Sequence, residues 1–421
     1  MPVCEILSVG SELTLGNIVD TNSSFLAKEI RKLGYTVRFC QTVSDDRDDM
    51  IAAFRMALDR SDLILATGGL GPTYDDRTRE VVSELLGKKL ILSEPVKERI
   101  RLYFTARQMP MSVNNLRQAM VPEGAKVLQN DWGTAPGLYI EEKGKEIFLL
   151  PGVPREMKEL FCNRVYPLLA KKSRSTVQTR ILRFYGIGES LLEERLGDLM
   201  KDSIDPNLAT FALSGEVALH ITAHGKSAEK VRAIIDQSEQ EILDKVGEYC
   251  YGAEQDCLES VLVKRFAERG LTIAAAESCT GGLVSQRITS VSGSSAVFRL
   301  GVCSYCEEMK EKVLNVSEKL LRENQVYSEE CALQMARGAL RLAESDIAIG
   351  ITGIAGPDGG TETDPVGTVY IAVTNGQKEC VVRNCFSFTG NNREYIRTLA
   401  SSKALAMALE LCDLFRHRDC F

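Results

Sequence analysis

Along the first third of the chain, short apolar segments alternate with amphipathic ones in a regular order. Apolar runs at 3–9, 35–43 and 62–67 are typical of buried strands. Between them, apolar residues recur at helical spacing over 21–34 and again over 50–58. The order strand, helix, strand, helix, strand predicts an α/β domain with a doubly wound sheet, in which ligands bind beyond the carboxyl ends of the strands.

The pattern changes after a polar and basic stretch at 171–178. A strand at 180–185, a helix over 186–200, a hairpin around Ser214-Gly215-Glu216 and a long helix at 228–246 predict a small α+β module. Beyond it, helices and strands alternate again, and the strands are expected at 271–275, 296–304, 346–351, 366–373 and 379–388. We therefore expect three domains, at 1–170, 178–252 and 254–421, the last of them again α/β.

The composition is that of a globular protein, and it disfavours membrane and nucleic-acid partners. The chain has 421 residues, of which 44% are hydrophobic and 26% charged, and this is ordinary for a globular protein. No apolar run approaches the roughly 18 residues that span a bilayer, so we expect a cytoplasmic protein without a membrane partner. The net charge of −7 leaves no basic stripe for nucleic acid, and the 13 cysteines follow no disulfide framework.

The most informative stretch is Ala276-Glu277-Ser278-Cys279-Thr280-Gly281-Gly282, which follows the apolar run at 271–275. A short apolar strand followed by a small polar residue and two glycines predicts a tight turn into a helix. Such a turn exposes one side chain, so Ser278 is a candidate nucleophile. The N–H groups of Thr280, Gly281 and Gly282 would lie at the helix N-terminus, where they can hold an anion or oxyanion. The alternative is a turn whose serine or threonine only caps the helix.

A serine nucleophile needs a base, and the C-terminal domain has only His417, in its tail. Lys310 is the candidate, because a buried lysine with a lowered pKa can deprotonate a serine. Tyr305 lies five residues earlier and can converge with it only if Tyr305 ends a strand and Lys310 starts a helix. The alternative for Lys310 is a solvated surface lysine. Cys279 is the rival nucleophile, but strand alternation should point it away from Ser278.

A second candidate site follows the strand at 62–67. Gly68-Gly69-Leu70-Gly71-Pro72-Thr73 allows a backbone to approach phosphates, and Asp75 and Asp76 beside it suit a divalent cation such as Mg²⁺. The two carboxylates could instead be first-turn residues favoured by a helix dipole. Asn114 belongs to an amide-rich segment of the kind that lines a nucleotide-binding cavity.

Two weaker signals favour structural roles. Cys303 and Cys306 form a lone C-x-x-C without a second pair, at the end of an apolar run. His220 and His224 share one face of a strand but have no third ligand nearby. We expect neither pair to bind a metal.

Several of these motifs together carry a resemblance. The loop at 67–73 with Asp75, Asp76 and Thr78 is similar to the nucleotide-binding domain shared by molybdopterin-biosynthesis proteins and the CinA family, and 114–119 and 151–157 favour CinA. The segments 186–190 and 214–217 resemble the CinA middle domain. The resemblance implies metal-dependent hydrolysis of ADP-ribose to AMP and ribose 5-phosphate, with the phosphates and metal at Gly68, Gly69, Gly71, Thr73, Asn114, Asp75 and Asp76.

The C-terminal motifs at 276–282, 305–310 and 352–368 resemble the CinA C-terminal domain, which is similar to nicotinamide mononucleotide deamidase. This resemblance implies hydrolysis of the nicotinamide amide to nicotinate mononucleotide and ammonia, without a cofactor. Ser278 would be the nucleophile, Lys310 its base and Tyr305 a hydrogen-bonding partner. Ser295, Thr352, Gly353 and Arg393 would hold substrate together with Thr280, Gly281 and Gly282, and the planar fork of Arg393 suits a phosphate. We also expect a homodimer.

The chain departs from the family pattern near the base. Cys306-Glu307 follows Tyr305 where the family has Ser-Asn, and a glutamate near Lys310 would raise the pKa of that lysine and weaken it as a base. Leu300-Gly301 stands where a Gly-Gly is expected, and Gly390-Asn391-Asn392-Arg393 replaces Gly-Asp-Arg. The alternatives to a salvage enzyme with two activities are therefore a nucleotide-binding regulatory or scaffold protein with silent sites, and a nucleotidyl-transfer role related to molybdopterin.

Overall fold

The computed structural model describes residues 2–172, 176–201, 205–225, 227–323, 326–386 and 392–413. The chain divides into two compact units, and the middle sheet has residues in both. The α/β fold expected from the sequence is confirmed. The expected strand 379–388 extends past the described residues, and Gly390, Asn391 and His417 lie outside them.

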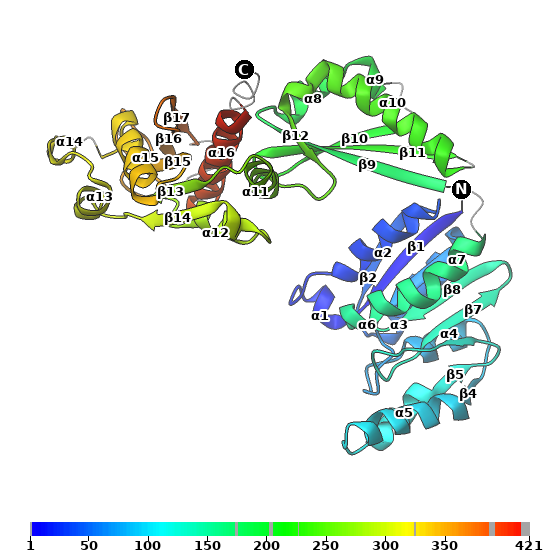
Figure 1. Cartoon of the computed structure of the whole chain (residues 1–421). Helices are drawn as coiled ribbons and strands as arrows, with labels where there is room; N and C mark the ends of the chain where they lie inside the picture. Colours follow the sequence, from blue (N-terminus) through cyan, green and yellow to red (C-terminus); the bar gives the residue numbers. More distant parts are fainter. Residues whose placement is uncertain are drawn as a thin grey trace. The chain divides into compact units, whose positions relative to one another are not determined.

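The N-terminal sheet has six strands in the order β2-β1-β3-β8-β7-β6. Four of them, β1, β2, β7 and β8, are labelled in Figure 1. The first four strands in the sheet order run parallel, and β7 and β6 are antiparallel to their neighbours. Short loops join β7 to β6 and β8, whereas each parallel connection contains a helix. The strands are β1 (Val3–Val9), β2 (Thr36–Val43), β3 (Leu63–Thr67), β6 (Lys126–Leu128), β7 (Gly137–Glu142) and β8 (Lys145–Leu150).

Helices cover both faces of this sheet because neighbouring side chains in a strand point to opposite faces. Ile6 packs with Leu26 and Leu160 on one face, whereas Leu7 packs in a second core with Phe54. The helices are α1 (Ser11–Thr14), α2 (Thr21–Lys32), α3 (Arg47–Arg60), α4 (Thr78–Leu85), α5 (Glu94–Ala106), α6 (Pro154–Leu160) and α7 (Tyr166–Lys172), with a π-helical turn Phe161–Val165 between the last two. A separate ribbon of β4 (Leu90–Leu92) and β5 (Met120–Pro122) lies beside the 3-10 segment Val113–Ala119.

The middle sheet has the order β10-β11-β9-β12. The helix expected over 186–200 is interrupted at Gly197, whose φ of 54° ends α8. The elements are β9 (Thr176–Tyr185), α8 (Glu189–Leu196), α9 (Asp198–Lys201), β10 (Asn207–Ala212), β11 (Glu216–Gly225), α10 (Ala228–Val246), a 3-10 turn (Gly247–Tyr249) and β12 (Cys250–Ala253).

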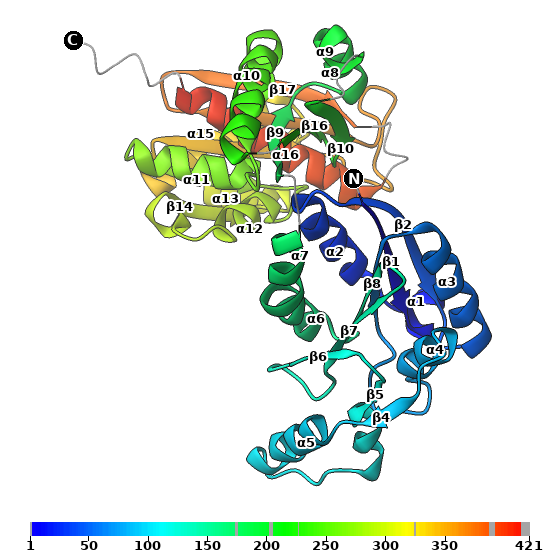
Figure 2. The same cartoon turned by 90° about the vertical axis from the view of Figure 1, so that its right-hand side faces the viewer.

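The C-terminal sheet has the order β14-β13-β15-β16-β17, with β14, β13 and β15 parallel and the last two strands antiparallel (Figure 1). Its edge strands β14 and β17 are also labelled in Figure 2. Its strands are β13 (Ile273–Glu277), β14 (Phe298–Cys303), β15 (Ile347–Gly353), β16 (Thr368–Thr374) and β17 (Glu379–Cys385). The three parallel strands direct their carboxyl ends to one edge, and the candidate site lies there.

Two groups of helices enclose this sheet. One apolar core joins it to α11 (Leu258–Glu268), α12 (Leu283–Thr289) and α16 (Arg393–Asp413). A second core lies against α14 (Glu318–Arg322) and α15 (Glu329–Ala343), and includes the end of α13 (Glu307–Leu314). Helix α15 lies so close to β15 that a Cβ on Gly350 would collide with the backbone of Ala332 and Ala336.

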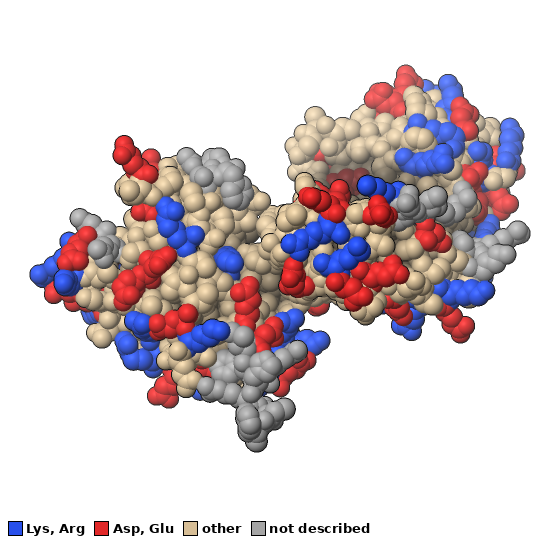
Figure 3. Space-filling model, turned by 90° about the horizontal axis from the view of Figure 1, so that it is seen from above, with Lys and Arg blue, Asp and Glu red and all other residues tan. Residues whose placement is uncertain are grey.

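Acidic and basic side chains alternate over the face of the molecule seen in Figure 3, as the mixed charge of the sequence implies. None of the helices in the described ranges combines the length and apolar character needed to cross a membrane.

Candidate active site

Ser278 lies directly after β13, at the carboxyl edge of the C-terminal sheet. Its backbone N–H donates to Ile351 O at 3.0 Å, which continues the pairing of β13 with β15 by one residue. Gly281 and Gly282 then adopt φ values of 60° and 91°, which side-chain-bearing residues rarely reach, and turn the chain into α12. The side chain of Ser278 therefore faces a cavity of about 520 Å³.

Lys310 is buried against Ser278. Its Nζ lies 3.0 Å from Ser278 Oγ and donates to Ser304 O at 3.0 Å and Tyr305 O at 3.3 Å. Pairing of Glu277 with Cys303 places the residues after β13 and β14 side by side, and Lys310 reaches both from the first turn of α13. Only 1% of the Lys310 side chain is exposed, so it is not the surface lysine of the alternative interpretation.

The surroundings of Lys310 make its neutral amine easier to form than that of an ordinary lysine. Burial lowers its pKa, and the opposing effects of Cys331, Cys279, Cys306 and Glu307 are smaller. A neutral amine has two hydrogens and one lone pair, which match two carbonyl acceptors and one hydroxyl donor. Lys310 can therefore accept the proton of Ser278. The carboxylate of Glu307 does raise the pKa, as expected from the sequence, but it does not outweigh burial.

Tyr305 and Arg393 form another part of the cavity wall. The phenol oxygen of Tyr305 accepts a hydrogen bond from Arg393 Nη2 at 2.9 Å, and Arg393 Nη1 donates to Gly356 O at 2.6 Å. Tyr305 thus contacts Lys310 through its carbonyl and Arg393 through its side chain. In the described part of the chain, no carboxylate lies within ion-pair distance of Arg393.

The turn residues expected to form an anion site lie outside the cavity wall. Gly281 N–H donates to Ser278 O at 3.0 Å, and the N-terminus of α12 is filled by the buried carboxylate of Glu277, which accepts from Val284 N at 3.0 Å and Ser285 N at 2.9 Å. The expectation for Thr280, Gly281 and Gly282 is corrected accordingly, because these three residues do not line the cavity. The sequence pattern identified the helix terminus but not the internal anion that occupies it.

Two further residues expected to bind substrate lie outside the cavity wall. Ser295 is exposed on a 3-10 turn before β14, about 20 Å of strand away from the carboxyl edge. Thr352 is fully buried, and its Oγ1 donates to Val326 O at 2.8 Å, behind the cavity. Gly353 does line the cavity. Ser295 precedes β14 in the sequence and therefore lies at the amino end of that strand, whereas the cavity lies at the carboxyl ends of the parallel strands.

Cys279 is buried beside the nucleophile and also reaches the cavity. Burial raises the pKa of its thiol to about 12, so it is protonated at neutral pH. This agrees with the choice of Ser278 over Cys279. Other wall residues were missed. Val326, Tyr327, Asp358 and Gly359 lie on loops without a periodic pattern, and Glu308 lies in the first turn of α13, where no motif singled it out.

The N-terminal domain has its own cavity, of about 380 Å³, at the carboxyl ends of β1 and β3. Gly68, Gly69, Gly71, Asp75 and Asp76 line it, as expected. Gly68 and Gly69 have φ values of 99° and 65°, and a Cβ on either would collide with Val9 O or the Thr78 side chain. Only glycine leaves this loop close enough to the strand ends to form the cavity.

Thr73 and Asn114 do not line this cavity. Thr73 supports Asp76, to whose Oδ2 it donates through its N–H at 2.9 Å and through its hydroxyl. Asn114 is exposed, and Gln118 from the same segment lines the cavity instead. The 3-10 conformation of Val113–Ala119 explains the exchange, since only one side of this segment faces inward.

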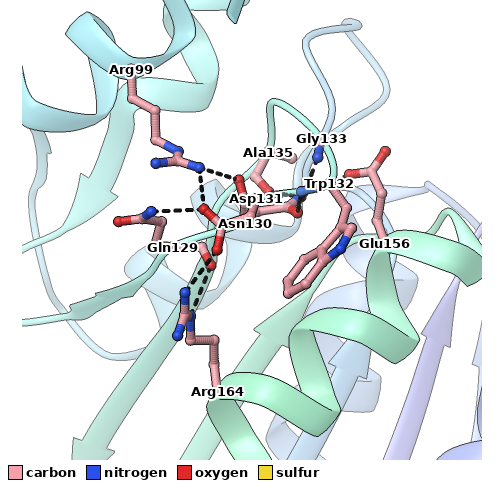
Figure 4. Close-up of polar contacts among 9 residues, drawn as sticks. All are labelled: Arg99, Gln129, Asn130, Asp131, Trp132, Gly133, Ala135, Glu156 and Arg164. Atoms are coloured by element: carbon pink, nitrogen blue, oxygen red, sulfur yellow. Dashed lines mark hydrogen bonds and ion pairs between the residues drawn. The ribbon is translucent and has the colours of Figure 1, made fainter.

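Figure 4 shows a supporting cluster beside this cavity. Asn130 accepts from the N–H groups of Trp132 and Gly133, and its Nδ2 donates to Ala135 O and to Glu156 Oε2, both at 2.8 Å. Its neighbour Asp131 pairs with Arg99 and Arg164. The loop is therefore fixed, and it holds Glu156 at the cavity.

The charges of this cavity are consistent with a divalent cation. None of the described residues that line it is lysine or arginine. Five are acidic, namely Glu12, Asp45, Asp75, Asp76 and Glu156. A phosphate group would be repelled here unless a cation intervened. No three His, Cys, Asp or Glu side chains in the described ranges are arranged as a complete metal site. Asp75 and Asp76 nevertheless fit Mg²⁺, which commonly takes one or two carboxylates with substrate phosphates and water.

Comparisons with known proteins agree along the whole chain. Residues 255–412 match the family described as CinA C-terminal domain, residues 5–171 match the probable molybdopterin binding domain, and residues 179–252 match the damage-inducible protein CinA KH domain. A putative competence-damage inducible protein of Caldicellulosiruptor bescii is 45% identical over 403 residues, which is 96% of this chain and 97% of the relative.

Two further proteins are similar to this chain. A CinA-like protein of Dictyoglomus turgidum is 44% identical over 370 residues, covering 88% of this chain and 90% of the relative. A crystal structure described as the protein CinA with unknown function from Thermoplasma acidophilum is 34% identical and covers 40% of this chain and 98% of its own, with a TM-score of 0.37. On the sequence identity and end-to-end coverage of the relatives, the chain belongs to the CinA family and has a molybdopterin-binding-like N-terminal domain.

Proposed function

We propose that the C-terminal cavity hydrolyses the carboxamide of nicotinamide mononucleotide to nicotinate mononucleotide and ammonia. The observation that carries this proposal is the buried Lys310 Nζ at 3.0 Å from Ser278 Oγ, with its two other contacts made to carbonyl oxygens. This arrangement suits a serine activated by a lysine, and the motif resemblance supplies the substrate.

The proposed reaction proceeds through an acyl-enzyme. Ser278 Oγ attacks the amide carbon while its proton passes to Lys310 Nζ, and the C–N bond then breaks as Lys310 returns the proton to the departing ammonia. Water, deprotonated by the same amine, cleaves the ester and restores Ser278. Arg393 donates to the Gly356 carbonyl and the Tyr305 hydroxyl, both of which are neutral, and it has no carboxylate partner in the described part of the chain. Its charge is therefore suited to the phosphate of the nucleotide.

The test is ammonia release from nicotinamide mononucleotide by the parent protein and by Ser278→Ala. Release should fall by several orders of magnitude in the variant. Glu311→Gln, on the exposed side of α13, is a matched control and should behave as the parent. Ammonia release that survives Ser278→Ala would refute the nucleophile assignment. Absence of release from the parent would favour a nucleotide-binding regulatory or scaffold protein.

We propose a second activity for the N-terminal cavity, the hydrolysis of ADP-ribose to AMP and ribose 5-phosphate with a divalent metal. The glycine loop and the five acidic wall residues support it. Asp75 and Asp76 would hold the metal, which when bound neutralises phosphate charge. AMP formation should be lost in Asp75→Asn. Transfer of a nucleotidyl group to a pterin, with no AMP from ADP-ribose, would favour the molybdopterin-related alternative. A cytoplasmic homodimer remains the proposed setting for both activities.

A further inference from the structure

The wall of the C-terminal cavity is rich in carboxylates. Glu307, Glu308 and Asp358 line it, and the cationic side chains among its described residues are Lys310 and Arg393. When Lys310 is neutral, as its role as a base requires, three carboxylates face a single guanidinium. The phosphate of a nucleotide accounts for Arg393 but not for the acidic side chains, which would repel it. A ligand that matches the whole wall must also carry positive charge.

An aromatic ring lies in the same wall. Tyr327 is 41% exposed and lines the cavity, as does Tyr305, whose hydroxyl is held by Arg393. Burial, followed by the proximity of Cys279, Tyr305 and Glu307, raises the pKa of the Tyr327 hydroxyl. Tyr327 therefore lies near both the nucleophile segment and an acidic side chain, and a half-exposed ring at this place offers a π face to the ligand.

The backbone at Tyr327 is anchored from the sheet. The neighbouring Val326 carbonyl accepts a hydrogen bond of 2.8 Å from Thr352 Oγ1, and Thr352 is fully buried at the end of β15. Thr352 is thus a positioning residue for this side of the cavity. The hydrogen bond holds the backbone before Tyr327 in place, which reduces the conformational entropy that this segment loses when a ligand packs on the ring.

The chemistry of the proposed substrate matches this wall. The amide that reaches Ser278 is attached to a flat pyridine ring, and the bond from its nitrogen to ribose gives that ring a positive charge. We propose that Tyr327 and Glu307 recognise the positive charge of this ring, by a cation–π contact and by charge pairing, so that the cavity selects cationic pyridinium amides over neutral ones. This inference rests on the proposed deamidase function. It gives Glu307 a binding role in addition to its effect on Lys310.

The discriminating ligands are nicotinamide mononucleotide and its reduced form, which has the same amide, ribose and phosphate but an uncharged dihydropyridine ring. Their affinities are measured by calorimetry on the full-length Ser278→Ala protein, in which the amide is not cleaved. The Ser278→Ala protein without a further substitution, which is the parent of this series, should bind nicotinamide mononucleotide more tightly than the reduced form. Tyr327→Leu should lose roughly 3- to 30-fold for the cationic ligand and much less for the neutral one.

Two further variants separate the contributions. Tyr327→Phe keeps the π face and should retain the preference, and Glu307→Gln should lose about two- to fivefold for the cationic ligand only. Glu311→Gln, on the same helix but outside the cavity wall, should match the parent. Equal affinity for both ligands in the parent, or equal losses for both in Tyr327→Leu, would overturn the inference.

The proposed function can fail separately. Ammonia release by protein with Ser278 intact, together with no effect of Tyr327→Leu on binding or KM, would refute only the recognition of charge. Selective binding without ammonia release would refute the deamidase activity and leave the cationic site standing.

Discussion

At Lys310, three oxygen atoms lie within hydrogen-bond distance of one amine, and almost no water reaches it. Two of these oxygens are main-chain carbonyls, which accept hydrogen bonds but provide no negative charge to hold a proton. The low pKa of Lys310 therefore follows from burial without an ion-pair partner in the described residues.

The pH dependence of the reaction should follow this pKa. The neutral amine is the active form, so kcat/KM for ammonia release should rise with pH and reach its plateau below the roughly 10.4 of an ordinary lysine. Lys310→Arg, which stays protonated, should lack this rising limb. A profile that still climbs at pH 10 would mean that the lysine is not shifted in the free enzyme.

The same burial should lower stability. Because the pKa of Lys310 is lower in the folded protein, the unfolded chain binds more protons between the two pKa values, and the destabilisation is greatest at low pH and disappears above about 10.4. Lys310→Met should therefore raise the free energy of unfolding at pH 7 by about 0.5–2 kcal/mol while ammonia release is lost. Urea unfolding at pH 7 and pH 10 measures this, and an equal gain at both pH values would contradict the explanation.

At the scale of elements, long sequence patterns predicted helices well, but they did not predict which side chains satisfy the ends of short helices. The helix expected over 228–246 is α10 with the same bounds, because its apolar spacing extends over five turns. Helix α12 has only seven residues, and its N-terminus is determined by the carboxylate of Glu277. That contact depends on where the last residue of β13 lies relative to the first turn of α12. The spacing of residue types does not specify this position.

The contact between α15 and β15 should be the least tolerant of added volume. Gly350→Ala places a methyl group against the backbone of Ala332 and Ala336, which cannot rotate away, so unfolding should become easier by about 1–3 kcal/mol or more. Gly188→Ala is the control, since its Cβ would meet no atom within 4 Å and its φ is −83°. Thermal unfolding of both variants measures the difference, and similar midpoints would show that α15 can move outward.

For the whole molecule, the two cavities belong to different sheets and have different chemistry. The reaction proposed for the C-terminal cavity uses Ser278 and Lys310, whereas a phosphate among the five carboxylates of the N-terminal cavity would need a cation beside it. A chelator should therefore abolish AMP formation from ADP-ribose and leave ammonia release unchanged, and added Mg²⁺ should restore AMP. Loss of both activities on chelation would mean that the metal also supports the C-terminal site or the fold.

The sequence predicted some residues of the two cavity walls and missed others. Ser278, Lys310, Tyr305 and Arg393 are brought to one cavity because each belongs to a strand end or helix start with a clear pattern. Ser295 is not part of the cavity wall, because a residue that precedes β14 lies at the amino end of the strand and the cavity lies at the carboxyl end. Tyr327 gave no signal, since a loop residue becomes part of a wall only when distant strands position it. Glu156 lies in the first turn of α6, inside a segment that indicated the family but not a place in the cavity wall.

The carbonyls that hold Lys310 have a consequence for how freely this chain can change. Ser304 O and Tyr305 O are provided by the backbone, so any residue that preserves the turn after β14 supplies the same two acceptors. Substitutions among the neighbouring side chains, such as Cys306-Glu307 in place of Ser-Asn, can then alter substrate preference while the base stays in place. Within a few residues of sequence, the backbone therefore holds the base, while the side chains are free to change the substrate preference.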